Sequence, residues 1–415
     1  MNTQPLAQPH VSETARSLSG GIALYVHIPF CETKCPYCDF NTYAGINHLL
    51  PPYLSALERE IEVWGTTLGH PTVNTVFLGG GTPSMLSPVQ MAGLLSSVRE
   101  AFPIAAGAEI TAEVNPDDAS IARLSAFREM GVNRISLGVQ SLDEAELRML
   151  GRRHGAAEAL AALANITNAG FTNFSADLMY GLPHQGMDTW RSTVKEVVGA
   201  GPQHVSAYAL TMEEGTPFGK QAADGVLPEQ DTDLAADMYW WADNAFAKAG
   251  LTNYEISNWA CPGMESRHNI AYWRNVPYLG VGPGAHSFLG GYRFANMRSP
   301  VGYITRVRAW EALTGGVDAL LRERPGPVAD IDPIDARTEM ADSVILGLRL
   351  GEGVSERSFH GRFGVGLHDV YGEAIAKSVA LELLRVDGEG LNAVLRLTRQ
   401  GRFLANEAFV RFLSA

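Results

Sequence analysis

Short apolar runs alternate with longer amphipathic stretches from residue 22 onward. The short runs are rich in β-branched and aromatic residues and predict strands, whereas the longer ones repeat apolar residues every three or four positions and predict helices. The expected strands are 22–27, 75–78, 109–114, 134–139, 174–179 and 204–210, and the expected helices are 53–64, 89–101, 121–130, 154–169, 189–200 and 233–249. A further β-like run covers residues 253–257.

Strands that alternate with helices of this length indicate βαβ units and a parallel sheet. Six units in this part of the chain favour a closed or partly closed barrel, a TIM-like parallel (β/α)6 arrangement, over two small domains. A doubly wound open sheet is the alternative. Glycines at 79–81, 131, 138 and 181 fall near the predicted strand ends. Because such barrels bind ligands at the carboxyl ends of their strands, we expect the functional site there.

The pattern changes after about residue 290. Residues 322–334 are rich in proline and aspartate and predict a linker or long loop. The predicted elements beyond it are helices at 337–348, 367–384 and 403–413 and a hairpin of 384–386 with 393–397. This order is similar to a winged-helix-like module. We therefore expect an α/β protein with a flexible tail (1–20), a barrel domain (21–290) and a smaller C-terminal helical domain (291–415).

Composition narrows the class of protein. The chain has 415 residues, of which 46% are hydrophobic and 19% charged, as in ordinary soluble globular proteins. Its net charge of −13 argues against nucleic acid as the main partner, because phosphate binding needs clustered Lys and Arg. No apolar run is long enough for a membrane span, and the first twenty residues lack the order of a secretory signal. These features predict a cytoplasmic protein.

Three of the four cysteines lie close together in the run Cys31-x3-Cys35-x2-Cys38, directly after a predicted strand. Thiolates are the ligands of iron–sulfur clusters, and short spacings let one loop wrap one cluster. Three ligands leave one of four irons open to a small molecule, much as catalytic metal sites keep an open position. A zinc site with a fourth ligand and three free thiols are the alternatives. Cys261 is isolated and reads as an ordinary buried thiol.

With Tyr37 before the third cysteine, this run resembles the radical S-adenosylmethionine superfamily. In that superfamily a 4Fe–4S cluster cleaves S-adenosylmethionine reductively to a 5′-deoxyadenosyl radical, and the cofactor carries the hard chemistry. The resemblance implies a radical-SAM barrel, both cofactors, and cluster ligation by the three cysteines. Gly80, Gly81 and Thr82 follow the predicted strand 75–78 within the sequence GGGTPS. Glycines permit close backbone approach to a ligand, and this sequence resembles the superfamily element that holds the methionine moiety.

Polar residues also sit at or after successive strand ends. They are Glu113, Gln140, Arg152 and Asp177. A carboxylate can bind an ammonium group or ribose hydroxyls, and Arg can bind a carboxylate. Taken singly, each is better explained as a loop or capping residue. In this order, and with Tyr25 six residues before the first cysteine, they resemble the S-adenosylmethionine contacts of the HemN-like branch, which includes oxygen-independent coproporphyrinogen III oxidases.

The sequence His268-Asn269-x-x-Tyr272-Trp273 carries the last signal. Neutral imidazole can ligate heme iron and aromatic rings suit a flat macrocycle, although a His beside a Trp is more often a packed residue. The element resembles the motif of HemW-type heme chaperones, which implies heme contact at His268 with Tyr272 and Trp273 as its platform. Phe40 stands where coproporphyrinogen oxidases of the branch carry an extra cysteine.

The resemblance covers residues 22–415, including a HemN-type C-terminal domain. It implies a heme chaperone of porphyrin metabolism that passes heme to apo-hemoproteins, with respiratory proteins as the first clients to consider. Transient contact with membrane-associated clients and a homodimer are compatible with it. Two enzymatic readings stay open: a coproporphyrinogen III oxidase, and another HemN-like radical enzyme that acts on heme or transfers methyl groups. Residue identity leaves open whether cleavage of S-adenosylmethionine is needed for function.

Overall fold

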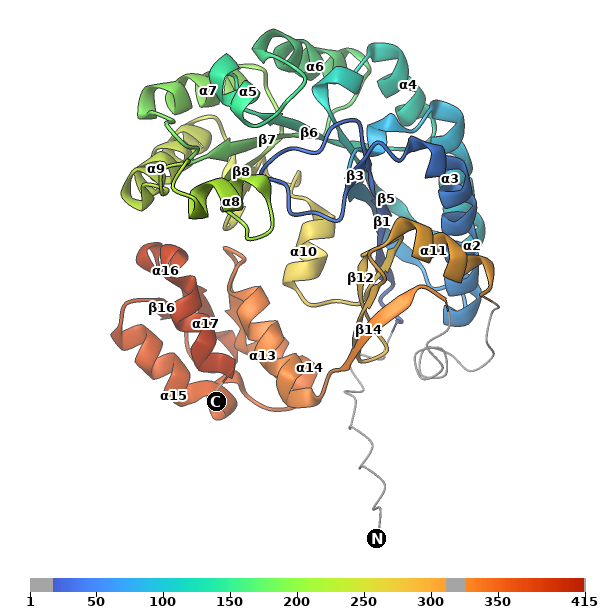
Figure 1. The fold of residues 1–415 in the computed structure, drawn as a ribbon. Coiled ribbons are helices and arrows are strands. Elements are labelled where there is room, and N and C mark those ends of the chain that lie inside the picture. Colours follow the sequence, from blue (N-terminus) through green and yellow to red (C-terminus); the bar gives the residue numbers. More distant parts are fainter. Residues whose placement is uncertain (1–17, 311–325, 414–415) are drawn as a thin grey trace.

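A twelve-stranded sheet forms the centre of the larger part of the molecule (Figure 1). The computed structural model describes residues 18–310 and 326–413. Six strands follow one another in chain order as parallel neighbours: β1 (Ile22–Ile28), β4 (Val73–Gly80), β5 (Ile104–Val114), β6 (Arg134–Gln140), β7 (Phe174–Tyr180) and β8 (His204–Ala209). β1 and β8 do not pair with each other, so the barrel is open on one side. The predicted α/β class with a partial parallel barrel is confirmed.

Helices cover the outer face of these strands (Figure 1). They are α2 (Leu50–Leu68), α3 (Pro88–Ala101), α4 (Ile121–Glu129), α6 (Ala156–Asn168), α7 (Met187–Gly199) and α9 (Thr232–Lys248). Their starts follow local chemistry: Ser87 and Gln90 form a capping box at α3, with Pro88 in the first turn. The apolar faces of these helices and the strands' outward side chains form one continuous core. All six expected helices are therefore present, with ends shifted by a few residues.

Shorter elements complete the larger part of the molecule. They are β2 (Phe30–Cys31), β3 (Tyr43–Ala44), α5 (Glu144–Met149), α8 (Pro217–Ala223), β9 (Thr252–Glu255), β10 (Asn258–Ala260), α10 (Arg267–Trp273), β11 (Tyr278–Val281), β12 (His286–Leu289), β13 (Tyr292–Asn296), α11 (Pro300–Arg308) and β14 (Val328–Pro333), with 3-10 turns at Asn47–Leu49, Pro83–Met85 and Pro116–Asp118. β11 pairs in parallel with β1, and the chain then adds β12, β13 and β14 as antiparallel strands.

Residues 322–325 of the predicted linker lie outside the described residues. The rest of that prediction is wrong in part, because β14 is a strand of the large sheet. Its proline and aspartates are compatible with pairing because β14 is an edge strand, whose outer side needs no ladder hydrogen bonds. The predicted domain boundary after residue 290 falls between β12 and β13, which are neighbours in that sheet. We therefore propose that the two units divide near residue 334. Most of the predicted tail (1–17) lies outside the described residues.

The C-terminal unit has its own apolar core. Its elements are α13 (Ala336–Gly347), β15 (Val354–Ser355), α14 (Glu356–Phe363), α15 (Leu367–Ala380), β16 (Leu384–Asp387), a 3-10 turn (Gly390–Asn392), β17 (Val394–Leu397), α16 (Arg399–Phe403) and α17 (Ala405–Leu413). The predicted hairpin is confirmed as β16 and β17. The predicted helix 367–384 ends early, at Ala380, because the chain turns there into the hairpin. Phe403 packs on Tyr239 and Trp240 of α9, with ring centroids 5.2 and 5.3 Å apart, which joins the unit to the barrel.

None of the helices described is both long and apolar enough to cross a membrane.

Candidate functional site

A cavity of about 550 Å³ lies inside the barrel and reaches the carboxyl ends of its strands. Most of the residues singled out in the sequence line it: Cys31, Cys35, Tyr37, Cys38, Gly80, Gly81, Thr82, Glu113, Gln140, Arg152 and Asp177. They come from β2 and the loop after it, from strands β4 to β7 and their carboxyl ends, and, for Arg152, from the loop between α5 and α6. The remaining four, Tyr25, His268, Tyr272 and Trp273, are not among the lining residues.

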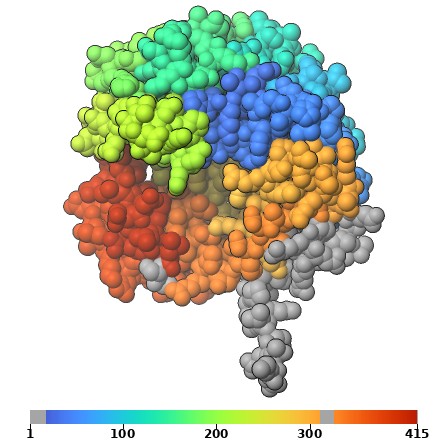
Figure 2. Space-filling view, in the orientation of Figure 1, coloured from blue at the N-terminus to red at the C-terminus, as the bar shows by residue number. Residues whose placement is uncertain are grey.

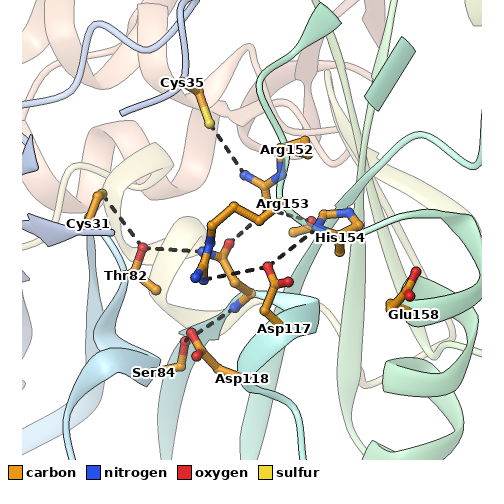
Figure 3. A network of polar contacts seen from close by, with 12 residues as sticks. Cys31, Cys35, Thr82, Ser84, Asp117, Asp118, Arg152, Arg153, His154 and Glu158 are labelled. Carbon is orange, nitrogen blue, oxygen red and sulfur yellow. Dashed lines mark hydrogen bonds and ion pairs between the residues drawn. The ribbon is translucent and has the colours of Figure 1, made fainter. Parts of the chain in front are cut away.

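The cysteine loop forms the upper wall of this cavity. Cys31 ends β2, and a backbone hydrogen bond from Cys38 N to Cys35 O (3.1 Å) closes a turn. Each sulfur has a different neighbour. Thr82 Oγ1 donates to Cys31 Sγ (3.6 Å), and Arg152 Nη1 donates to Cys35 Sγ (3.8 Å) (Figure 3). Cys38 Sγ lies 3.8 Å from Thr42 Oγ1. The thiols are half-buried and form no disulfide. Burial raises the pKa of Cys31 and of Cys38.

This donor set fits an iron–sulfur cluster. Each cysteine of a cluster binds a different iron, so the sulfurs need to surround a volume rather than converge on one point. No group of three His, Cys, Asp or Glu side chains in the described parts of the chain is placed to hold a single metal ion. Structural zinc needs four such ligands around one point. Three thiols from one loop at the cavity wall are donors of the kind that such a cluster takes.

The glycine-rich end of β4 brings bare backbone to the cavity. Gly80 has φ 108°, and a Cβ on it would lie 2.5 Å from the ring of His27. Only glycine fits both conditions. Its N–H donates to Glu113 Oε2 (3.0 Å), which links the ends of β4 and β5. Packing against His27 thus requires glycine at position 80, and Gly80 and Gly81 both line the cavity.

A polar network connects the cysteines to the strand ends (Figure 3). Arg152 Nη2 donates to Asn115 Oδ1 (2.8 Å) and Gly138 O (2.9 Å), and Asn115 Nδ2 donates to Thr82 Oγ1 (3.3 Å). The sequence prediction missed Asn115. A signal was available, because Asn115 lies two residues after Glu113, on the same face of the strand. The network holds the Arg152 guanidinium beside Cys35.

Glu113 and Asp177, the two acidic residues predicted from the sequence, differ in their surroundings. Glu113 is half-buried, and desolvation together with the charge of Asp177 raises its pKa to about 8. Asp177 accepts hydrogen bonds from Ser136 Oγ and Ser175 Oγ, both at 2.7 Å. Gln140, at the end of β6, adopts φ 65° and completes this part of the lining. A positively charged ligand group near Glu113 would favour its ionised form.

The predicted heme residues form a packed layer beneath the cavity. His268, on α10, is 1% exposed; its Nδ1 shares a hydrogen bond with Thr75 Oγ1 and its Nε2 with Tyr272 OH, both 2.9 Å. Phe77 stacks on its ring at 5.2 Å. Burial lowers the pKa of His268 to about 3, so the ring is neutral. Both ring nitrogens of His268 therefore take part in hydrogen bonds.

Trp273, the third predicted heme residue, and Tyr25, predicted as an S-adenosylmethionine contact, also lie outside the cavity lining. Tyr25 OH lies 2.9 Å from His27 Nδ1, and Trp273 packs under the guanidinium of Arg349, 5.1 Å from its ring centroid. Of the H-N-x-x-Y-W element, Asn269 is the residue that lines the cavity. Phe40, where an extra cysteine would mark the oxidases, is 62% exposed at the cavity wall. The structure thus gathers around the cavity the residues predicted for the cluster and, except for Tyr25, those predicted for S-adenosylmethionine, but not those predicted for heme.

Comparison with known proteins agrees with this arrangement. Residues 25–197 match the family model of the radical SAM superfamily, and residues 334–404 match that of the HemN C-terminal domain. The chain is 34% identical to heme chaperone HemW of Bacillus subtilis over 390 residues, which are 94% of this chain and 98% of the relative. It is 39% identical to heme chaperone HemW of Mycobacterium tuberculosis over 334 residues, 80% of this chain and 82% of the relative.

The fold has a solved counterpart in coproporphyrinogen III oxidase (HemN) from Escherichia coli. The TM-score is 0.79 at 24% identity, over 96% of this chain and 91% of the other. At this identity the similarity concerns the fold alone. The cysteine loop, the two matched domains and the near full-length similarity to HemW proteins lead to one conclusion: the chain belongs to the HemW family of the radical S-adenosylmethionine superfamily.

Proposed function

We propose that the protein is a heme chaperone, which binds heme and passes it to apo-hemoproteins while carrying a 4Fe–4S cluster and S-adenosylmethionine. The cofactor part of the proposal rests on one observation: a single cavity is lined by Cys31, Cys35 and Cys38 together with Arg152 and Glu113. The heme half rests on the relatives, which are named heme chaperones. Phe40, in the place of the oxidases' extra cysteine, favours a chaperone over an oxidase.

In this proposal the three cysteines hold the cluster, which when bound supplies the electron for cleavage of a sulfonium. Arg152 binds the carboxylate of S-adenosylmethionine, since a guanidinium already fixed by Asn115 loses little freedom on pairing. Glu113 binds the ammonium group. The backbone of Gly80 and Gly81 allows the methionine moiety close approach. Asp177 and Gln140 are left for the ribose hydroxyls, and Tyr25 and Tyr37 support the walls.

His268 can contact heme only after a local rearrangement of the structure. Because both ring nitrogens are hydrogen-bonded and the ring is buried, ligation of iron requires that Tyr272 release Nε2 and that α10 turn. Trp273 lies under Arg349 and would have to part from it to serve as a platform. We therefore propose His268, Tyr272 and Trp273 as heme residues of a rearranged state, and Asn269 as the residue of α10 that already faces the cavity.

The proposed setting is the cytoplasm, with hemoproteins of the respiratory chain as clients and with a homodimer as one form of the protein. A second candidate function is oxygen-independent coproporphyrinogen III oxidase, favoured by the shared fold over nearly the whole chain. In that reaction hydrogen is taken from propionate side chains. The two candidates share the cluster and S-adenosylmethionine but differ in the fate of the tetrapyrrole.

One experiment separates them. The anaerobically reconstituted protein is given S-adenosylmethionine, a reductant and coproporphyrinogen III, and a second sample is titrated with heme. We expect tight, stoichiometric heme binding, transfer to an apo-hemoprotein, and no protoporphyrinogen. Robust formation of protoporphyrinogen would instead establish the oxidase, and analysis showing zinc without iron and sulfide would remove the whole cofactor assignment.

A further inference from the structure

Arg134 is a buried cation without a counter-charge. It is the first residue of β6, its side chain lines the cavity, and it is 2% exposed. Its Nε has no hydrogen-bond partner, and it takes part in none of the ion pairs formed by the described residues. A buried charge without a partner is strongly unfavourable. The guanidinium therefore needs a partner that the described side chains do not supply.

The neighbours of Arg134 are neutral. On the paired strand it lies opposite Thr111, whose buried Oγ1 also has no partner. Burial lowers the pKa of His204 and of His268, and the charge of Arg134 lowers both further. His268 is hydrogen-bonded to Thr75, and His204 is hydrogen-bonded to Tyr254. The floor of the cavity thus combines one fixed positive charge with uncharged, already bonded groups.

The acidic residues of the barrel are engaged elsewhere. Glu109 accepts hydrogen bonds from the main-chain N–H groups of Arg267 and His268, both at 3.0 Å. Glu113 is bonded to Gly80 N, and Asp177 is bonded to two serines. None of these carboxylates lies within ion-pair distance of Arg134. An anionic group from a ligand is the partner that remains.

That group is not the carboxylate of S-adenosylmethionine. Arg134 precedes Gln140 by six residues along β6, which corresponds to about 20 Å of strand. Gln140 and Arg152 lie at the strand ends with the cysteines, where the methionine moiety must sit to reach the cluster. A ligand group at Arg134 therefore occupies the opposite end of the cavity.

We propose that Arg134 forms a carboxylate-binding subsite on the cavity floor and pairs with a propionate of the bound heme. The ligand's identity rests on the proposed function, whereas the subsite rests on the geometry alone. A planar guanidinium binds a carboxylate through two parallel hydrogen bonds, so Arg suits this role better than Lys. Tyr208 and Asn269 line the same cavity as Arg134. Figure 2 shows the molecular surface hollowed between the barrel and the C-terminal unit.

The test compares heme with heme dimethyl ester, in which both propionates are uncharged. The cluster-reconstituted full-length protein and its variants R134M and R134K are each titrated with both ligands. R148M is the control, because the Arg148 side chain is 72% exposed. We expect the unchanged protein and R148M to prefer heme by about 10- to 100-fold, as for a charged, buried hydrogen-bonded pair. R134M should lose this preference and R134K should keep part of it. An unchanged preference in R134M would overturn the assignment.

A second measurement works without heme and separates the subsite from the function. The melting temperature is recorded in sodium propionate and in sodium chloride of equal ionic strength. Propionate should raise it for the unchanged protein and for R148M but not for R134M, which should itself melt no lower than the unchanged protein in chloride. If the protein binds no heme, the proposed function fails. Stabilisation by propionate that requires Arg134 would still support the subsite in that case. Absence of that stabilisation in the unchanged protein would then refute it.

Discussion

The two ends of the barrel cavity differ in how their polar groups are bonded. The mouth is the end with the three cysteines and Arg152, and the floor is the end with Arg134 and His204. At the mouth, half-buried thiols and exposed backbone come from one loop and from neighbouring strand ends, and Arg152 is already held by Asn115 and Gly138. At the floor, buried side chains meet from distant parts of the chain: Thr75 and His268 are hydrogen-bonded across 193 residues. The mouth leaves groups free for ligands, whereas on the floor most groups satisfy one another.

The comparison teaches how far a motif predicts chemistry. A ligand motif in a loop keeps its donors available, because little else in the fold uses them. A motif on a short packed helix competes with the core for the same side chains. His268 is the example, since the atoms that would bind heme iron bind Thr75 and Tyr272.

The largest expected effect concerns the mouth. Cys35→Ala should abolish the cluster, with loss of its absorption and of bound iron and sulfide, because three ligands leave no substitute among the neighbouring side chains. The fold should persist, since a half-buried loop residue is lost rather than core packing. Cys261→Ala is the control and should keep the full iron and sulfide content. A full complement of iron in the Cys35 variant would disprove the ligand assignment.

The next effect tests the floor. His268→Ala removes a buried ring and two hydrogen bonds, so the free energy of unfolding should fall by about 2–4 kcal/mol. Tyr272→Phe removes one of those bonds and should cost about 1 kcal/mol. Denaturant unfolding measures both. The Soret spectrum of heme titrated into the two variants then decides the second role of His268: an unchanged band and affinity in His268→Ala would exclude it as an iron ligand.

A smaller effect is expected for the arginine of the mouth. Arg152→Met should weaken S-adenosylmethionine binding by about 10- to 100-fold, the usual cost of a lost charged hydrogen-bonded pair. Arg153→Met is the matched control, since Arg153 pairs with Asp117 at 3.5 Å and should change affinity little. Equilibrium binding to the reconstituted protein provides the measurement. Equal losses in the two variants would show that general positive charge, rather than the fixed position of Arg152, matters.

The smallest effect concerns pH. The raised pKa of Glu113, about 8, means that its carboxyl is mostly protonated at neutral pH without ligand. A cationic ligand needs the ionised form, so affinity for S-adenosylmethionine should rise by up to about tenfold per pH unit below that pKa and level off above it. Glu113→Gln should flatten this profile, while Glu144→Gln, at the surface, should keep it. A pH-independent affinity in the unchanged protein would separate Glu113 from the ligand.

Several features could be predicted from the sequence because their causes are local. The alternation of strands and helices gave the parallel barrel, since hydrophobic period depends on neighbours in the chain. The cysteine spacing and the glycine-rich run after β4 indicated the mouth, because loop and strand-end chemistry survives folding unchanged. Asn115 was missed although its position two residues after Glu113 places it on the same face.

The tertiary structure decided the rest, for a common physical reason. Whether a polar side chain is free depends on partners that folding brings from elsewhere, and the sequence does not show those partners. His268 and Arg134 are both buried, yet one has both ring nitrogens bonded and the other has no counter-charge. The addition of β14 to the sheet likewise depended on β13 as a neighbour, because an edge strand with proline and aspartate has no pattern of its own. Local sequence thus set the elements and the cluster loop, and long-range packing set which side chains remained available.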